Sequence, residues 1–138
     1  MQQYLKAPVS NGNRREQALI RRWWHEENSG NGALVWEYYL EGRYADAVWF
    51  PNAPNPGIEV SGRKAPEKYP LQGIEIVLCE AKSHLTPELI GQALVYMKFA
   101  CYAGARVRET IVFSETADSS MKKVAEDLRL KVVVRPLN

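Results

Sequence analysis

The chain has little cysteine, no long apolar run and almost no excess of charge. Its 138 residues include two cysteines, neither in a C-x-x-C motif, so no disulfide framework is expected and we place Cys79 and Cys101 in the core. No segment approaches the roughly 20 apolar residues that a membrane-spanning helix requires. The first residues lack the apolar stretch of a signal peptide. We therefore expect a reduced, cytoplasmic protein that does not contact a membrane.

Several catalytic signatures are missing as well. The sequence contains no phosphate-binding glycine loop, no His-Glu-x-x-His and no Gly-x-Ser-x-Gly. Its histidines, His25 and His84, lie far apart in the sequence and do not form a metal pair. The formal net charge is only +2, so global charge says little about partners. Any site must therefore be found from local patterns of residues.

Hydrophobic periodicity predicts a single α/β domain over residues 1–138. Helices are expected over 14–27, 87–103 and from 118 or 119 onward, and strands over 34–40, 44–50, 73–81, 109–114 and 131–135. The first three strands should be antiparallel, and the later ones, which alternate with helices, should be parallel. The sequence thus predicts a mixed sheet with helices on both faces. The helix over 87–103 is apolar nearly all round, so it should be covered on most sides.

The segment at about 51–72 reads as an inserted loop. It contains five prolines and two glycines, and it is long for a structureless connection in a compact domain. We expect it to be functional or to form a small extra hairpin, with a short strand at 58–60. Its cations Arg63, Lys64 and Lys68 are candidates for binding nucleic acid, or for a dimer contact.

The strand over 73–81 ends in Glu80-Ala81-Lys82, an acid and an amine that point to the same face of a sheet. Asp46 lies in the preceding apolar strand. Mg²⁺ prefers one or two carboxylates with other oxygen ligands, so Asp46, Glu80 and the Ala81 carbonyl would suit it. Lys82 would contact the attacking water or the scissile phosphate of a phosphodiester. In the alternative reading, Asp46 and Lys82 only neutralise each other at a sheet edge.

This order of elements and acids resembles the PD-(D/E)XK nuclease superfamily, which has the restriction-endonuclease-like fold, over about residues 14–134. The resemblance implies an α-β-β-β-α-β core, here with an additional helix and strand. It also implies a Mg²⁺-dependent nuclease in which Mn²⁺ can substitute. The acids of the family motif fall on Asp46 and Glu80, and its lysine falls on Lys82.

The chain departs from the family pattern in two places. Ala45 stands where the motif has a proline, a residue that carries no chemistry. The separation between Asp46 and Glu80 is longer than in compact members, and the insertion at about 51–72 accounts for it. No cysteine cluster for an iron–sulfur site is present.

The resemblance gives a role to further residues. Many members place an acid on the first helix, at a metal-bound water or a second metal, and Glu16 matches that position, with Glu37 as its rival. Gln92-Ala93-Leu94-Val95-Tyr96 is similar to the Gln-x-x-x-Tyr of RecB-type nucleases, and Gln92 and Tyr96 share a helix face. The resemblance thus makes Glu16 and Gln92 catalytic and Tyr96 a nucleic-acid contact. Ordinary surface and core roles for these residues are the alternative.

The sequence therefore predicts a stand-alone, Mg²⁺-dependent DNA nuclease, acting as an endonuclease or as a structure-specific nuclease, with a homodimer as one arrangement. Two alternatives stay open. One is a non-catalytic nucleic-acid-binding or protein-interaction module on the same fold. The other is an RNA nuclease, because the proposed site residues do not distinguish the two sugars.

Overall fold

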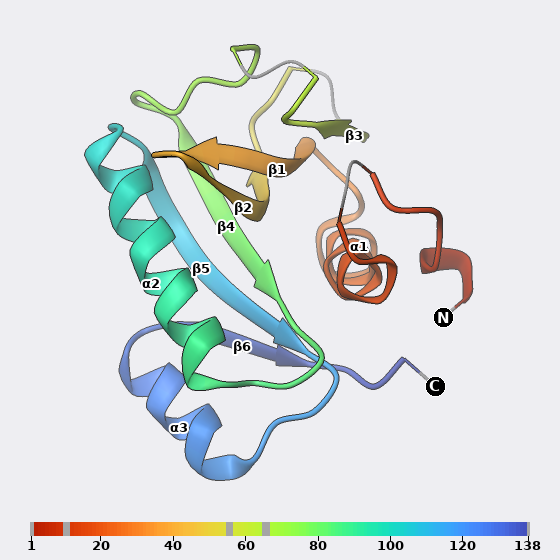
Figure 1. The fold of residues 1–138 in the computed structure, drawn as a ribbon. Coiled ribbons are helices and arrows are strands. Elements are labelled where there is room, and N and C mark those ends of the chain that lie inside the picture. Colours follow the sequence, from red (N-terminus) through yellow and green to blue (C-terminus); the bar gives the residue numbers. More distant parts are fainter. Residues whose placement is uncertain (1, 10–11, 55–56, 65–66, 138) are drawn as a thin grey trace.

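The computed structural model describes residues 2–9, 12–54, 57–64 and 67–137 (Figure 1). The order of elements along this part of the chain is η1 (Gln2–Tyr4), α1 (Arg14–Asn28), β1 (Ala33–Leu40), β2 (Arg43–Phe50), β3 (Ile58–Ser61), β4 (Glu75–Ala81), α2 (Pro87–Tyr102), β5 (Arg106–Ser114), α3 (Ser119–Asp127) and β6 (Lys131–Val134). The predicted elements are confirmed, with ends that lie within a few residues of the expected ones.

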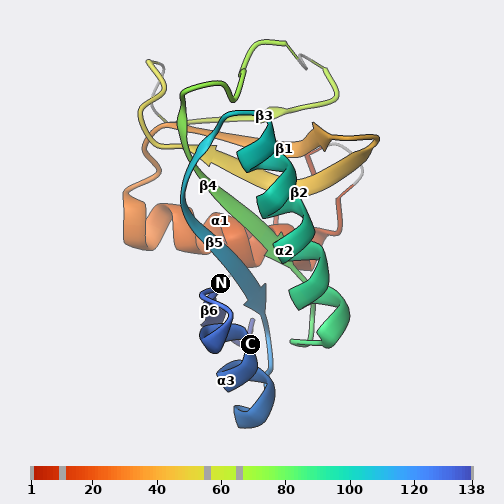
Figure 2. The same cartoon turned by 90° about the vertical axis from the view of Figure 1, so that its left-hand side faces the viewer.

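The strands of the described chain form one six-stranded sheet in the order β3-β1-β2-β4-β5-β6. β1, β2 and β4 pair antiparallel, and β4, β5 and β6 pair parallel, as their hairpin and helical connections predict. α1 covers one face of the sheet, and α2 and α3 cover the other (Figures 1 and 2). The predicted mixed sheet with helices on both faces is confirmed.

The loop at 51–72 adds an edge strand and not the extra hairpin that was one expectation. β3 runs parallel to β1. The reason is the path of the loop: the N–H of Gly57 donates to the carbonyl of Gly32 at 2.8 Å, at the beginning of β1. The chain therefore enters β3 beside the first residue of β1 and continues in the same direction. The expected short strand at 58–60 is confirmed.

The end of β3 is fitted closely against the middle of β1. The N–H of Gly62 donates to the carbonyl of Trp36 at 2.6 Å. A Cβ atom at Gly62 would lie 2.6 Å from the carbonyl oxygen of Glu37, which is closer than a side chain permits. Glycine is required for this approach, and the approach brings Arg63 next to Glu37.

α2 is less covered than its apolar sequence predicts. One face of the helix packs on the sheet, whereas Val95 is 47% exposed and Tyr102 is 80% exposed. As an outer layer, the helix has no further element packed on its far side in the described chain, so the expectation of cover on most sides is wrong. For the same reason Cys101 is exposed and not a core residue, while Cys79 is buried as expected.

A buried ion pair ties α1 to β3. Arg21 is 1% exposed, and its Nε donates to both carboxylate oxygens of Glu59, at 2.9 and 3.1 Å. The indole N–H of Trp36 donates to the same carboxylate at 2.9 Å, and Arg21 also donates to the carbonyl of Tyr4. Burial alone would raise the pKa of Glu59, but the hydrogen bonds from Arg21 and Trp36 hold this pKa below its ordinary value.

Replacing Glu59 by alanine should therefore lower the free energy of unfolding by about 3 kcal/mol, because it leaves the Arg21 charge buried without its partner. Glu59→Gln keeps an acceptor and should cost less. Glu126→Ala, an exposed change on α3, should stay within about 0.5 kcal/mol of wild type. Urea unfolding followed by tryptophan fluorescence measures all three. Equal stability of Glu59→Ala and Glu126→Ala would contradict a structural role for the pair.

Candidate active site

β2 and β4 separate where the predicted acids lie. Their pairing reaches Ala47 and Cys79. One residue further, the N–H of Asp46 donates to Oε2 of Glu80 at 2.7 Å, and the N–H of Ala81 donates to Oδ2 of Asp46 at 2.8 Å. Two side-chain carboxylates thus take the place of backbone carbonyls in the ladder. The structure brings together Asp46, Glu80 and Ala81, as the sequence predicts.

Asp46 and Glu80 are two like charges held close together inside the sheet. Glu80 is 2% exposed, and Asp46 is half-buried. Burial raises the pKa of Asp46 to about 6, although the hydrogen bond from Ala81 opposes this. Burial, and then the charge of Asp46, raise the pKa of Glu80 well above its ordinary value. Both acids therefore hold their protons more readily than free carboxyl groups, and a bound divalent cation would relieve the cost of ionising them side by side.

Lys82 is the cation next to this pair. Burial is the largest influence on Asp46, Glu80 and Glu16, and it raises the pKa of each. The positive charge of Lys82 acts in the opposite direction and lowers each of these pKa values. Its ammonium lies 3.7 Å from the carboxylate of Glu88 on α2, an exposed and therefore weak ion pair. Among the described residues, no ion pair joins Lys82 to Asp46, although the charge of Lys82 lowers the pKa of Asp46.

Glu16 and Glu37, the rival acids of the sequence, both line a small cavity on the α1 side of Asp46. The cavity has a volume of about 20 Å³, and Ala81 also borders it. This is room for about one water-sized particle. Glu16 lies in the first turn of α1, where Asn13 caps the helix and sets its beginning. Burial raises the pKa of Glu16. The structure does not choose between the two acids, because it brings both to the same cavity.

The backbone of β1 is irregular at Glu37, which has a φ of 54°. This left-handed conformation is strained for a residue with a side chain. Trp36 packs on the α1 side of the sheet and Tyr38 on the α2 side, so the usual alternation of faces is broken between them. Their partners on β2 flank Asp46. The irregularity therefore lies directly beside the acid pair, and sequence reasoning missed it because no glycine marks it.

On the α2 side, the two residues of the Gln-x-x-x-Tyr pattern are placed differently. Burial raises the pKa of Tyr96, and the charges of Glu80 and Asp46 raise it further, so its phenol lies near the acid pair. Gln92 lies one turn away, where its amide contacts the carboxylate of Glu88 at 3.5 Å. The structure thus brings Tyr96 toward the acids and places Gln92 beside the partner of Lys82.

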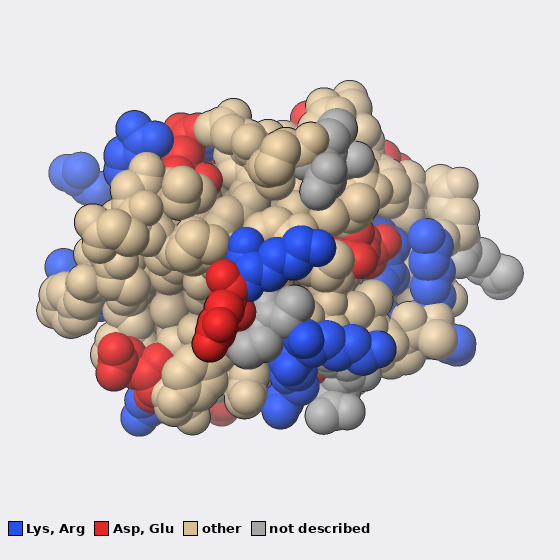
Figure 3. Space-filling model, turned by 90° about the horizontal axis from the view of Figure 1, so that it is seen from above, with Lys and Arg blue, Asp and Glu red and all other residues tan. Residues whose placement is uncertain are grey.

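Of the three cations of the loop, Arg63 reaches the site. Its Nε donates to Oε1 of Glu37 at 2.8 Å. Lys64 and Lys68 border a separate hollow beside β3. Seen from above, lysines and arginines are interspersed with acidic side chains and do not form a field of one sign (Figure 3). Sequence reasoning did not foresee the contact between Arg63 and Glu37, because it depends on the parallel pairing of β3 with β1.

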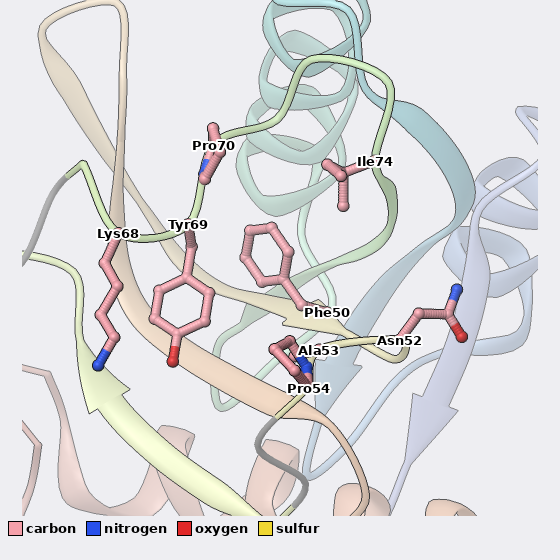
Figure 4. Close-up of a pocket in the computed structure, with 8 residues that line it drawn as sticks. All are labelled: Phe50, Asn52, Ala53, Pro54, Lys68, Tyr69, Pro70 and Ile74. Carbon is pink, nitrogen blue, oxygen red and sulfur yellow. The ribbon is translucent and has the colours of Figure 1, made fainter.

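A larger cavity of about 210 Å³ lies at the far end of β2 from Asp46 (Figure 4). Its walls are mostly apolar, and the rings of Phe50 and Tyr69 have centroids 5.3 Å apart there. The side chains of Lys68 and Asn52 lie at its edge. None of the candidate acids borders this cavity, so it is not part of the candidate active site.

The donor set fits a hard cation of the Mg²⁺ type. Among the described residues, no group of three or more His, Cys, Asp or Glu side chains is arranged to hold a metal ion. A Mg²⁺ site does not need such a group, because this ion uses one or two protein carboxylates and takes its other oxygen ligands from water and phosphate. Asp46, Glu80 and the carbonyl of Ala81 are therefore suitable ligands for Mg²⁺.

No family model, curated protein or solved structure matches this chain. The resemblance to the PD-(D/E)XK superfamily is consequently carried by the residues and their order, and it stays a prediction. None of the described helices is long and apolar enough to span a membrane.

Replacing Asp46 by asparagine should stabilise the metal-free protein at alkaline pH. The pKa of Asp46 is about 6 in the folded protein and about 3.9 in an unfolded chain. Its charge therefore costs folding free energy above about pH 6, and this cost disappears as the pH falls below about 4. We expect Asp46→Asn to exceed wild type by on the order of 1 kcal/mol at pH 8 in a chelator, and to match it near pH 4.

Denaturant unfolding at the two pH values measures this difference. Asp118→Asn is the matched control, because Asp118 caps α3 through a side-chain oxygen that asparagine retains, and it should change stability little at either pH. A wild-type protein that is more stable than Asp46→Asn at pH 8 would show that the carboxylate of Asp46 stabilises the fold.

Proposed function

We propose that this protein is a Mg²⁺-dependent nuclease of the PD-(D/E)XK type that hydrolyses phosphodiester bonds of DNA in the cytoplasm, as an endonuclease or structure-specific nuclease. The observation that supports the proposal most is the pair of carboxylates, Asp46 and Glu80, in the opening between β2 and β4 with Lys82 beside it. Two like charges that are buried together cost folding free energy. A bound cation gives a reason for keeping them.

Asp46, Glu80 and the carbonyl of Ala81 would hold the cation. When bound, it neutralises charge on the phosphate and lowers the pKa of a water. Lys82 donates hydrogen bonds to the phosphate or to the attacking water, and its charge stabilises the negative charge that grows in the transition state. Glu16, on the α1 side of Asp46, accepts a hydrogen bond from a water in the small cavity, with Glu37 as the alternative acceptor.

The remaining predicted residues bind and orient the substrate. Gln92, beside Glu88 and Lys82, serves as a further polar group of the active site, and the phenol of Tyr96 contacts the DNA next to the acid pair. Arg63 binds a backbone phosphate close to the site, and Lys64 and Lys68 contact more distant phosphates. A homodimer would present two such sites to the two strands of a duplex.

Lys82→Ala should reduce the rate of DNA cleavage by about 10²- to 10³-fold, because it removes the charge that stabilises the transition state. Lys98→Ala, an exposed change on α2, is the matched control and should cut at the wild-type rate. Plasmid, branched and single-stranded DNA, and a single-stranded RNA, are each incubated with Mg²⁺ or Mn²⁺ and with a chelator. The nuclease reading fails if wild type cuts none of them faster than Lys82→Ala does.

A second candidate function is a non-catalytic DNA-binding module. It is favoured by the hydrogen bonds in which both carboxylates already accept a backbone N–H, since a protonated or purely structural pair could use the same contacts. Calorimetric titration with Mn²⁺ separates the two functions. Heat that Asp46→Asn abolishes supports the nuclease, whereas an absence of heat together with salt-sensitive DNA binding supports the module.

The same titration decides between the rival acids. If Glu16 is the acid that serves the cation site, Glu16→Gln should weaken Mn²⁺ binding by about tenfold, the order expected when a group that supports a metal ligand is lost. Glu37→Gln should then have a smaller effect, because the Glu37 carboxylate is bonded to Arg63. The reverse order of effects would assign the role to Glu37.

A further inference from the structure

Two tyrosines at the end of the β1–β2 hairpin expose their rings beside the candidate active site. Tyr39 is 52% exposed and Tyr44 is 36% exposed. They face each other in the register of the two strands, and their ring centroids lie 5.6 Å apart with the planes at 68°. We call these two residues the tyrosine pair.

The tyrosine pair lies on the same side of the sheet as the cavity of Glu37. Tyr38 and Leu40 pack on the α2 side, so Tyr39, between them, points to the α1 side. Arg63 links the two places directly. Its guanidinium carbon lies 3.7 Å from the centroid of the Tyr44 ring, and its Nε donates to the carboxylate of Glu37. A series of contacts therefore runs from Glu37, which borders the same small cavity as Asp46, to the exposed rings.

Exposed flat rings at this place suit an unpaired base better than a duplex. In a double helix the faces of the bases are stacked on each other, so a protein surface meets mainly phosphates and base edges. An unpaired base has a face available, and stacking on an aromatic side chain strengthens binding by roughly tenfold or more per base, with little dependence on sequence.

The small net charge of the protein also favours an unpaired base over a duplex. On the face seen from above, cations are interspersed with acids (Figure 3), and the net charge is +2. Attraction to phosphates alone therefore gives little affinity. The tyrosine pair, with Arg63 stacked on Tyr44, supplies the contact that charge does not.

On the basis of the proposed nuclease function, we infer that the tyrosine pair binds an unpaired nucleotide next to the scissile phosphate. The substrate class is then DNA that carries a single-stranded arm beside a duplex. Glu37, which Arg63 links to Tyr44, borders the same small cavity as Asp46. The cut is accordingly expected close to the junction between the arm and the duplex.

The test compares a duplex that carries a single-stranded arm with the fully paired duplex of the same sequence. The proteins are wild type, the double variant Tyr39→Leu with Tyr44→Leu, the double variant with phenylalanine at both positions, and Tyr102→Leu. Tyr102 is an exposed tyrosine at the end of α2 and serves as the matched control. Cleavage is measured in Mg²⁺, binding is measured by fluorescence anisotropy in a chelator, and thermal unfolding shows whether each variant is folded.

We expect wild type to cut and bind the armed duplex at least tenfold better than the paired one. The leucine variant should lose this preference, whereas the phenylalanine variant, which keeps the stacking faces, and Tyr102→Leu should retain it. A role limited to stabilising the hairpin would instead lower the melting temperature of the leucine variant and leave the substrate preference unchanged.

The failure of this inference differs from the failure of the proposed function. Wild type that cuts both duplexes equally, with no effect of the leucine variant, overturns the inference and leaves a nuclease. Wild type that cuts neither duplex but binds the armed one, with binding lost in the leucine variant, supports the stacking site and overturns the nuclease. Wild type that neither cuts nor binds the armed duplex overturns both.

Discussion

Two backbone N–H groups at the opening between β2 and β4 are satisfied by carboxylates and not by a neighbouring strand. Where the strands separate, the N–H groups of Asp46 and Ala81 would otherwise lack acceptors inside the protein, which is costly. Glu80 and Asp46 supply these acceptors, and as a result two carboxyl groups with raised pKa values lie side by side within the sheet. Lys82 and Tyr96 lie where they interact electrostatically with this acid pair, and Asp46 borders the small cavity on the α1 side.

Much of the fold could be predicted because local patterns determine it. α1 buries one side, so its apolar residues recur at the helical period. β4 is buried on both faces, so it reads as a nearly continuous apolar run. Thr86 and Pro87 mark the start of α2. The acid pair could also be found, because Asp46 and Glu80 are charges within otherwise apolar strands. A charged residue that interrupts an apolar strand can be recognised in a single sequence.

Features that depend on long-range pairing could not be predicted. The direction of β3 follows from where the loop meets β1, and no local pattern of residues encodes that position. The left-handed backbone of Glu37 is imposed by tertiary structure, since glutamate has no preference for it. The exposure of Cys101 and of the outer side of α2 depends on how many layers the domain has. An apolar helix sequence does not reveal this.

The close fit of Gly62 against β1 constrains one part of the long loop, the segment that contains β3. On one side, Glu59 is fixed to Arg21 and Trp36, and on the other, Gly62 is pressed against the carbonyl of Glu37. The six residues 58–63 thus form a segment whose length and spacing are fixed by its contacts with α1 and β1. An insertion within residues 58–63 would therefore move Arg63 away from the Glu37 carboxylate that it contacts.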